Sequence, residues 1–506
     1  MTTAEKLAQL DAHSARVLRC GGPKAVEKQH ALGKRTARER IELLMDTGTF
    51  TEVDRFVRHR CTAFGMGDKD IPADGVVTGY GTVEGALVYV YSQDASVLGG
   101  SVGEMHARKI AGLYDLASKT GAPVIGLIDS TGLRLQEATD ALNGFGEIYR
   151  KQALASGVVP QITAVFGSCG GGLALIPGLT DFTFMESKKA KLFVNSPNAM
   201  EGSWTEKDDT SSAKFQSEEA GLVDFVGTEE EILSQIRELV CMIPGNNEEN
   251  DAYGECEDDL NRDIADAAGY NGDTTIVLSM LADDQNFVEV KSAYGKDMVT
   301  GFLRLNGETV GAVANRSRIY DEEGKETANF GEVLSAAGCE KAADFVNFCD
   351  AFSIPVLSLT DVAGYAASKC EEKKIAKAAA KLTYAFAGAT VPKVNVVIGK
   401  AFGSAYTVMN SKAIGADITY AWPDAKIGTM DAKLAAKIIC DGQDAAAIDA
   451  CAAEYEALQT SAESAAQRGY VDQIIEAADT RKYVIGAFEM LFTKREDGPV
   501  RKHGTV

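Results

Sequence analysis

Short, continuous apolar runs alternate along the chain with longer helical stretches. Runs such as ALVYVYS (86–92), PVIGLID (123–129) and QITAVFG (161–167) are rich in Val, Ile and aromatic residues, which is typical of strands buried on both faces. A stretch such as EMHARKIAGLYDLASKT (104–120) separates two of these runs. The alternation predicts an α/β fold with a mainly parallel sheet and crossover helices. Residues 1–45 are expected to be mostly helical, with Thr36 and Glu39 forming a capping box.

The pattern repeats in the second half of the chain. APVIGLIDSTG (122–132) aligns with IPVLSLTDVAG (354–364), and the run that begins at Pro160 aligns with the run that begins at Pro392, both at an offset of 232 residues. Residues 76–94 resemble residues 298–316 at an offset of 222 residues, so an insertion of ten residues is expected near 318–332. Order and spacing agree over three elements, which indicates two tandem domains related by internal duplication.

A length of 506 residues also favours two large domains over one. We expect an N-terminal domain over 1–245 and a C-terminal domain over 268–506. Between them, residues 246–267 hold nine acids against Arg262 alone. Such a stretch is expected to bury little and to serve as a linker.

The net charge of −22 argues against a nucleic-acid partner and against an anionic membrane surface. The ten cysteines are scattered singly, so we expect free thiols and neither a disulfide framework nor a metal site. No signal peptide or membrane span is predicted. A cytoplasmic protein is therefore expected, which a partner subunit could hold at the cytoplasmic face of a membrane.

Two glycine-rich turns, each between a strand and a helix, are the strongest chemical signal: FGSCGGGLAL (166–175) and GKAFGSAYTV (399–408). Glycine lets a ligand approach the backbone, and the N–H groups that open the helix lack acceptors. Two such donors aimed at a thioester carbonyl would stabilise an enolate. The alternative is that the glycines only allow close packing of helix and strand.

The histidine inventory limits the chemistry. None of the five histidines lies near either turn in sequence, and the second half has only His503. No G-x-S-x-G elbow, Walker A motif or dinucleotide fingerprint is present. These absences favour backbone donors, with the base supplied by substrate or cofactor.

Other candidate residues have structural alternatives. Cys169 lies in the first turn, but a packing role is favoured over that of a nucleophile. Asp129 and Asp361 end equivalent strands and are expected to cap the following turns. A basic cluster could meet the phosphates of a ligand, or form a solvated helix face or a salt-bridge network; its members are Lys34, Arg35, Arg38 and Arg40.

Several longer motifs resemble biotin-dependent acyl-CoA carboxyltransferases, in particular propionyl-CoA carboxylase β subunits and methylmalonyl-CoA decarboxylase α subunits. They include GKRTARERIELLMDTGTFTEVD, YSQDASVLGGSVGEMHARKI, GEIYRKQALASGVVPQI and RGYVDQIIEAADTRKYVIGAFEMLFTKRE. The resemblance runs from about residue 20 to residue 504. It implies crotonase-like ββα-spiral domains and a carboxyl transfer between a short-chain acyl-CoA and biotin.

The resemblance also implies roles for the turns. The first turn would hold the acyl-CoA thioester and the second the biotin ureido oxygen, on backbone donors expected at Gly171, Gly172, Leu173, Gly403, Ser404 and Ala405. The residues expected to contact substrate are Gly132, Leu133, Arg134, Cys169, Gly170, Gly364, Tyr365 and Thr407, the last at the position that tunes acyl selectivity.

The partners follow from the same resemblance. The chain has no M-K-M biotinylation motif, so biotin would arrive on a separate carrier protein. A biotin carboxylase or a membrane decarboxylase subunit would be the further partner, and a homo-oligomer, a hexamer, is expected. Whether the chain carboxylates or decarboxylates stays open.

The chain departs from the family pattern around its predicted ligand sites. Leu173 replaces a usual alanine and is expected to narrow the acyl pocket, while Ser404 replaces a usual glycine. The segments 195–215 and 363–380 lack familiar motifs. Alternatives therefore remain: an unusual acyl substrate, an altered assembly subunit that binds CoA or carrier without turnover, or a biotin-independent crotonase-type enzyme, which duplication disfavours.

Overall fold

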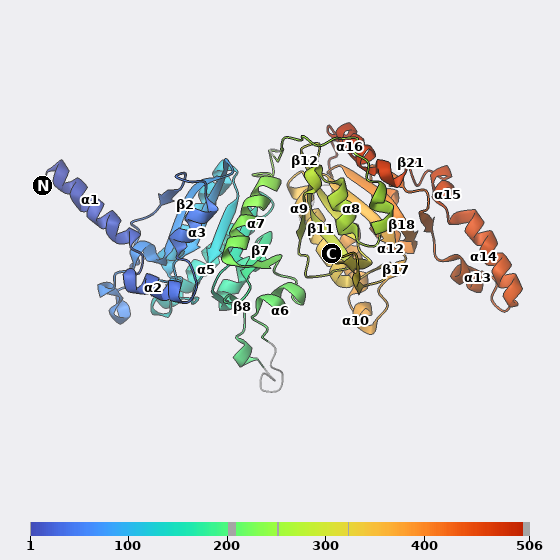
Figure 1. Cartoon of the computed structure of the whole chain (residues 1–506). Coiled ribbons are helices and arrows are strands. Elements are labelled where there is room, and N and C mark those ends of the chain that lie inside the picture. The colour runs from blue at the N-terminus through green and yellow to red at the C-terminus, as the bar shows by residue number, and fades with distance from the viewer. Residues whose placement is uncertain (1, 201–208, 250–251, 322, 499–506) are drawn as a thin grey trace. The chain divides into compact units, whose positions relative to one another are not determined.

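The computed structural model describes residues 2–200, 209–249, 252–321 and 323–498 (Figure 1). The chain divides into two compact units, Met1–Asp251 and Ala252–Val506. Each unit is an α/β domain built on its own sheet, as the alternating pattern of the sequence predicts.

Unit 1 contains a seven-stranded sheet in the order β1-β2-β3-β4-β5-β7-β9. The pairs β1–β2 and β2–β3 are antiparallel, and the strands from β3 to β9 pair in parallel. A separate small sheet joins β6 to β8. The strands are β1 (Thr51–Val53), β2 (Val76–Val83), β3 (Ala86–Gln93), β4 (Val124–Ile128), β5 (Gln161–Val165), β6 (Ser168–Gly170), β7 (Phe182–Glu186), β8 (Lys191–Phe193) and β9 (Phe225–Gly227).

The helices of unit 1 supply the crossover connections. Helix α4 packs against α5, and α3 packs against α7. Thr36 and Glu39 form the predicted capping box at the start of α3. The helices are α1 (Thr3–Leu18), α2 (Pro23–Ala31), α3 (Ala37–Leu44), α4 (Glu104–Thr120), α5 (Ala138–Ala155), α6 (Ala213–Glu218) and α7 (Glu229–Met242).

Unit 2 contains a sheet in the order β10-β11-β12-β16-β18-β19-β21, with β20 paired to the far end of β18. Its first three strands are antiparallel and the rest pair in parallel, as in unit 1. The strands are β10 (Phe287–Val290), β11 (Met298–Leu305), β12 (Glu308–Asn315), β13 (Arg318–Tyr320), β14 (Glu326–Asn329), β15 (Val333–Leu334), β16 (Val356–Val362), β17 (Gly364–Tyr365), β18 (Lys393–Phe402), β19 (Ile418–Ala421), β20 (Lys426–Gly428) and β21 (Gln473–Ile474).

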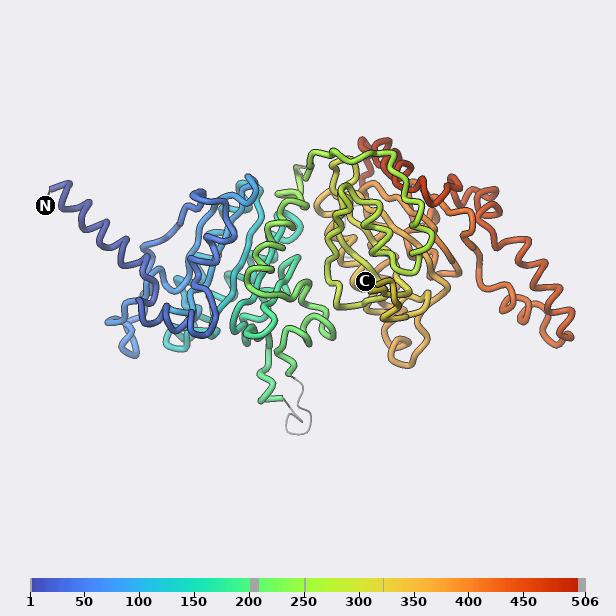
Figure 2. The backbone as a smooth tube through the Cα atoms, in the orientation of Figure 1, coloured from blue at the N-terminus to red at the C-terminus, as the bar shows by residue number. Residues whose placement is uncertain are grey.

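Helices α9 and α11 of unit 2 pack on one another, and a helical hairpin, α13–α14, extends away from the sheet (Figure 2). The helices are α8 (Thr274–Leu281), α9 (Ala336–Ala351), α10 (Lys369–Glu372), α11 (Ile375–Gly388), α12 (Gly403–Val408), α13 (Ala432–Ile439), α14 (Ala445–Gln459), α15 (Ala462–Gln467) and α16 (Thr480–Leu491).

Equivalent buried side chains make equivalent bonds in the two units. Lys109 on α4 donates to the carbonyls of Ala73 and Val76. Lys341 on α9, 232 positions later, donates to the carbonyls of Tyr294 and Met298. The hairpin β13–β14 lies where the ten-residue insertion is predicted. The units therefore share local bonding as well as sheet order.

The acidic segment between the domains buries more than its composition predicts. Arg262 pairs with Asp258 at 2.8 Å and also donates to two carbonyls next to α8. Ile264 and Ala267 are at most 3% exposed. Arg481 also pairs with Asp258 and donates to the Asp259 carbonyl, so residues from Ala252 onward are part of unit 2.

All ten cysteines are free, as their scattered positions predict. Among the residues that the structure describes, every helix is too short or too polar to cross a bilayer.

The buried lysines make stability depend on pH. Burial lowers the pKa of Lys341 to about 7 and that of Lys109 to about 8. The unfolded chain therefore binds more protons than the folded chain between about pH 7 and pH 10, so these groups make the free energy of unfolding rise with pH. We expect Lys341→Met to have a shallower rise in melting temperature between pH 7 and pH 9 than the unmodified chain. Calorimetry checks this, and identical slopes would contradict the assignment.

Candidate active site

The first glycine turn joins β5 to a short 3₁₀ helix, η5 (Gly171–Leu175), through β6. Gly171 has a φ of +63°, a conformation that side chains disfavour. A Cβ added at Gly172 would lie 2.9 Å from the Tyr149 hydroxyl. The Leu173 side chain is 0% exposed and belongs to the core of unit 1. The expectation that Leu173 narrows an acyl pocket finds no support in this placement of its side chain.

The second glycine turn has the same construction. Strand β18 runs into α12, and Gly403 has a φ of +61°. Ala405 is buried, and Thr407 donates to the Gly403 carbonyl at 3.3 Å. Burial raises the pKa of Tyr365, on β17.

The predicted donors occupy the same helix positions in both turns. Gly172 and Leu173 are the second and third residues of η5, and Ser404 and Ala405 are the second and third residues of α12. The first N–H groups of a helix have no acceptor in the preceding turn. Each turn therefore presents a pair of backbone donors next to a left-handed glycine.

A carboxylate lies beside the first glycine of each turn. Asp129 accepts from Lys34 at 2.6 Å, and Asp361 accepts the backbone N–H of Lys400 at 2.7 Å. A Cβ at Gly167 would lie 1.9 Å from the Asp129 carboxylate, and one at Gly399 would lie 2.3 Å from that of Asp361. A Cβ at either glycine would therefore collide with the carboxylate. Asp361 accepts a backbone N–H of the second turn, as a cap does, whereas Asp129 bonds the side chains of Lys34 and Arg40.

The four cations near the N-terminus all form ion pairs. Arg40 is buried and pairs with Asp129 and Glu229, while Lys34 shares Asp129. Arg38 forms a two-pronged pair with Glu52, and Arg35 pairs with Glu230. The salt-bridge alternative is therefore what the structure shows. Desolvated pairs of this kind hold the N-terminal helices against the sheet.

The segment after β4 is fixed by its backbone. Val102 donates to the Gly132 carbonyl and accepts from the N–H of Arg134. The Arg134 side chain is 0% exposed and pairs with Asp74 at 2.6 Å and with Glu137 at 2.8 Å. The Arg134 side chain is thus engaged within unit 1, and no local pattern in the sequence indicates its two acidic partners.

Cys169 and Gly170 shape the first turn from within. Cys169 is fully buried, and burial raises the pKa of its thiol far above the usual range. Gly170 lies against the Phe193 ring, which a Cβ would approach to 2.7 Å. Both residues pack, as expected for Cys169, and neither supplies a nucleophile.

The segment after β16, which departs from the family pattern, forms a strand and a capped helix. Strand β17, which contains Gly364 and Tyr365, pairs with β15. Ser368 caps α10, and Glu371 accepts the N–H of Ala336 at the start of α9 at 2.6 Å. Of the other departure, residues 201–208 lie outside the described residues.

A cavity of about 540 Å³ adjoins the second turn. Ser404, Tyr406 and Thr407 are among the residues that line it. The lining also includes residues that sequence reasoning did not single out: Ile427, Gly428, Thr429, Gln459, Ser464, Ala465, Arg468 and Tyr470. The turn therefore opens into a space with apolar and polar walls, large enough for a bicyclic ligand.

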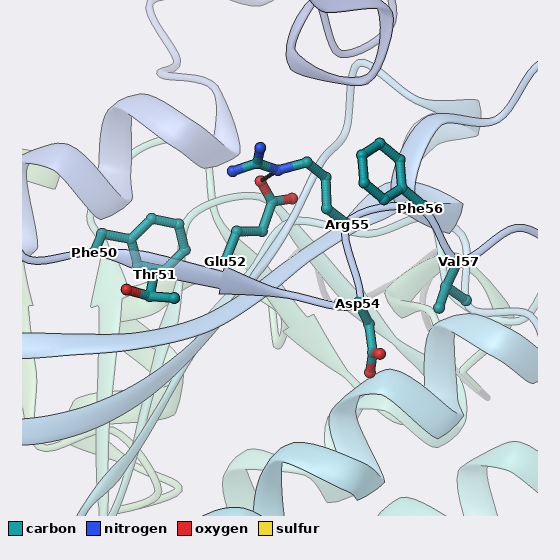
Figure 3. A pocket seen from close by; sticks show the side chains of 7 residues that line it. All are labelled: Phe50, Thr51, Glu52, Asp54, Arg55, Phe56 and Val57. Carbon is teal, nitrogen blue, oxygen red and sulfur yellow. Dashed lines mark hydrogen bonds and ion pairs between the residues drawn. The ribbon is translucent and has the colours of Figure 1, made fainter. Parts of the chain in front are cut away.

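Another hollow, of about 740 Å³, lies along β1 (Figure 3). Its side chains include Arg55 and Glu52, which pair at 2.7 Å. Strands β2, β3 and β4 separate it from β5. This hollow is therefore not part of the first glycine turn.

Within the described ranges, no cluster of three His, Cys, Asp or Glu side chains is arranged to hold a metal ion.

Comparison with known proteins adds independent evidence. A model of the carboxyl transferase domain matches residues 28–506. Methylmalonyl-CoA decarboxylase subunit alpha of Propionigenium modestum is 40% identical, with 99% of each chain covered. The propionyl-CoA carboxylase beta chain of Saccharopolyspora erythraea is 41% identical, covering 100% of this chain and 96% of that protein. A structure of hexameric transcarboxylase 12S with methylmalonyl-coenzyme A and methylmalonic acid bound matches with a TM-score of 0.94 at 36% identity, covering 100% of this chain and 99% of that chain.

Proposed function

Because the chain belongs to the carboxyl transferase family, we propose that its two glycine turns hold the two reactants of a biotin-dependent carboxyl transfer. The chain is a carboxyltransferase of the propionyl-CoA carboxylase β and methylmalonyl-CoA decarboxylase α type. Its α/β units are crotonase-like. The observation that supports the proposal most strongly is the matched pair of backbone donors after Gly171 and Gly403.

The first turn would bind the thioester of a short-chain acyl-CoA of the methylmalonyl or propionyl type. The N–H groups of Gly172 and Leu173 would donate to the thioester oxygen as negative charge develops on it. Each such donor is typically worth about 3–4 kcal/mol of transition-state stabilisation. Gly132 and Leu133 would border the thioester through their backbone, while Cys169 and Gly170 fix the shape of the turn from behind.

The second turn suits a biotin ring. Ser404 and Ala405 would direct their N–H groups at the ureido oxygen, and the adjoining cavity offers Tyr406 and Ile427 as apolar walls. Bound biotin would supply the ring nitrogen that exchanges the carboxyl group. Thr407 lines the same cavity and would limit the reactants that fit beside the ring. The protein needs only to bind, orient and stabilise oxyanions, which agrees with the absence of histidine near either turn in sequence.

Biotin would arrive on a separate carrier protein. The two directions of transfer correspond to two assemblies: one with a biotin carboxylase, the other with a membrane decarboxylase subunit. The relatives carry both names, carboxylase and decarboxylase. We propose a homo-oligomer, a hexamer like that of transcarboxylase 12S.

The test uses purified full-length protein with methylmalonyl-CoA or malonyl-CoA and free biotin. Mass spectrometry measures the loss of the carboxylated thioester. We expect this loss to depend on added biotin. A rate that is the same with and without biotin would indicate a biotin-independent enzyme. Binding of CoA without turnover, with biotin on a carrier also supplied, would indicate an assembly subunit.

A further inference from the structure

Tyr149 connects α5 to the first glycine turn. Its hydroxyl donates to the carbonyl of Gly172 at 2.5 Å. The ring is half-buried against the core of unit 1, with Phe145 at a centroid distance of 6.0 Å. Burial raises the pKa of the hydroxyl, so it keeps its proton and remains a donor. A tyrosine anchored on a long helix thus holds one peptide group of a five-residue 3₁₀ helix.

That peptide is the one whose N–H is the proposed donor of Leu173. Every described peptide bond is trans, so the Gly172 carbonyl and the Leu173 N–H point in opposite directions from one plane. The Leu173 side chain is locked in the core. With its carbonyl bonded to Tyr149 and its side chain packed, this peptide has one fixed orientation, and its N–H is directed away from Tyr149.

We propose that Tyr149 is a positioning residue for carboxyl transfer, which orients the Gly172–Leu173 peptide so that the Leu173 N–H meets the thioester oxygen. The inference rests on the proposed function. A hydrogen bond to a carbonyl also polarises its amide, and this strengthens the N–H of the same peptide as a donor. Tyr149 therefore acts through Leu173 and does not touch the reacting atoms.

Position 172 fits this arrangement. A Cβ there would lie 2.9 Å from the Tyr149 hydroxyl, so a side chain would push the hydroxyl from the carbonyl. In the second turn Ser404 stands where the first turn has Gly172, so the peptide clamp described here belongs to the first turn.

The test compares Tyr149→Phe with Tyr89→Phe in full-length protein. Tyr89 is a buried tyrosine of β3 whose hydroxyl accepts from Thr120, so the control loses the same atom away from the turn. We expect Tyr149→Phe to lower kcat about tenfold, the effect of one lost hydrogen bond, with KM for the acyl-CoA within about twofold of normal. Tyr89→Phe should leave kcat unchanged.

Analogue binding separates positioning from a structural role. A CoA thioether that ends in a nitronate presents an enolate-like oxyanion, whereas a simple alkyl thioether presents none. We expect Tyr149→Phe to bind the nitronate about tenfold more weakly and the alkyl thioether normally. Equal weakening for both ligands, or none for the nitronate, would overturn the proposal. If the unmodified protein transfers no carboxyl group, the proposed function fails, and the nitronate comparison still decides the role of Tyr149.

Discussion

Ser404→Pro is expected to reduce carboxyl transfer by about 10²–10³-fold, because proline removes one of the two N–H donors of the second turn. Proline fits the first turn of a helix, where its N–H is not needed for the helix itself. The variant leaves the preceding residue, Gly403, unchanged, so the φ of +61° at that position is still adopted by a glycine. The rate is measured with saturating acyl-CoA and increasing biotin, so that a loss on the biotin side is visible as such.

Ser404→Ala is the matched control for this variant. It keeps the backbone N–H and removes only the side-chain hydroxyl, which is exposed. We expect its rate to stay within about threefold of normal, since an exposed hydroxyl contributes little. Equal activity of the proline and alanine variants would show that the N–H of residue 404 has no part in the reaction.

Arg134→Met is expected to lower the free energy of unfolding of unit 1 by about 3–5 kcal/mol, because it leaves two buried carboxylates without their cation. Asp74 and Glu137 are both nearly inaccessible to water. Burial already raises the pKa of Asp74 against the opposing charge of Arg134. Without the arginine Asp74 takes up a proton more readily, so the loss should be smaller at acid pH. Hydrogen exchange of peptides from β3 and α4 under denaturant measures the loss in unit 1 alone.

Two control experiments test the expected loss of stability in Arg134→Met. Arg108→Met removes an arginine whose pair with Glu104 is partly exposed, and we expect a loss of at most about 1 kcal/mol. Adding Asp74→Asn and Glu137→Gln to Arg134→Met should recover part of the stability. A stable Arg134→Met protein with a raised KM for acyl-CoA would instead place the Arg134 side chain in the CoA channel.

Local sequence signals predicted the elements that local forces determine. The capping box at Thr36 and Glu39 and the two glycine turns follow from a few adjacent residues. The shared bonds of Lys109 and Lys341 agree with the repeat at an offset of 232 residues. In these places residue type and spacing determine the backbone.

Long-range partners could not be predicted in the same way. Arg134 was expected at a ligand channel, yet it pairs with Asp74, 60 positions earlier in the chain. Tyr149 is an ordinary amphipathic-helix residue in the sequence, and its bond to Gly172 depends on how α5 packs over the turn. The composition of the acidic segment before α8 predicts little packing, but Arg262 pairs with Asp258 and donates to a carbonyl of α8. Each of these outcomes depends on tertiary packing that periodicity does not encode.

The most direct test of the central claim is the transfer of label from methylmalonyl-CoA, carrying carbon-13 in its free carboxyl group, to biotin on a carrier domain. After rapid mixing with the purified chain, mass spectrometry of the intact carrier should show a labelled carboxyl group on biotin, with propionyl-CoA formed in equal amount. Label that stays in the thioester while CoA binds, or that is released at a rate independent of biotin, would contradict the carboxyltransferase account.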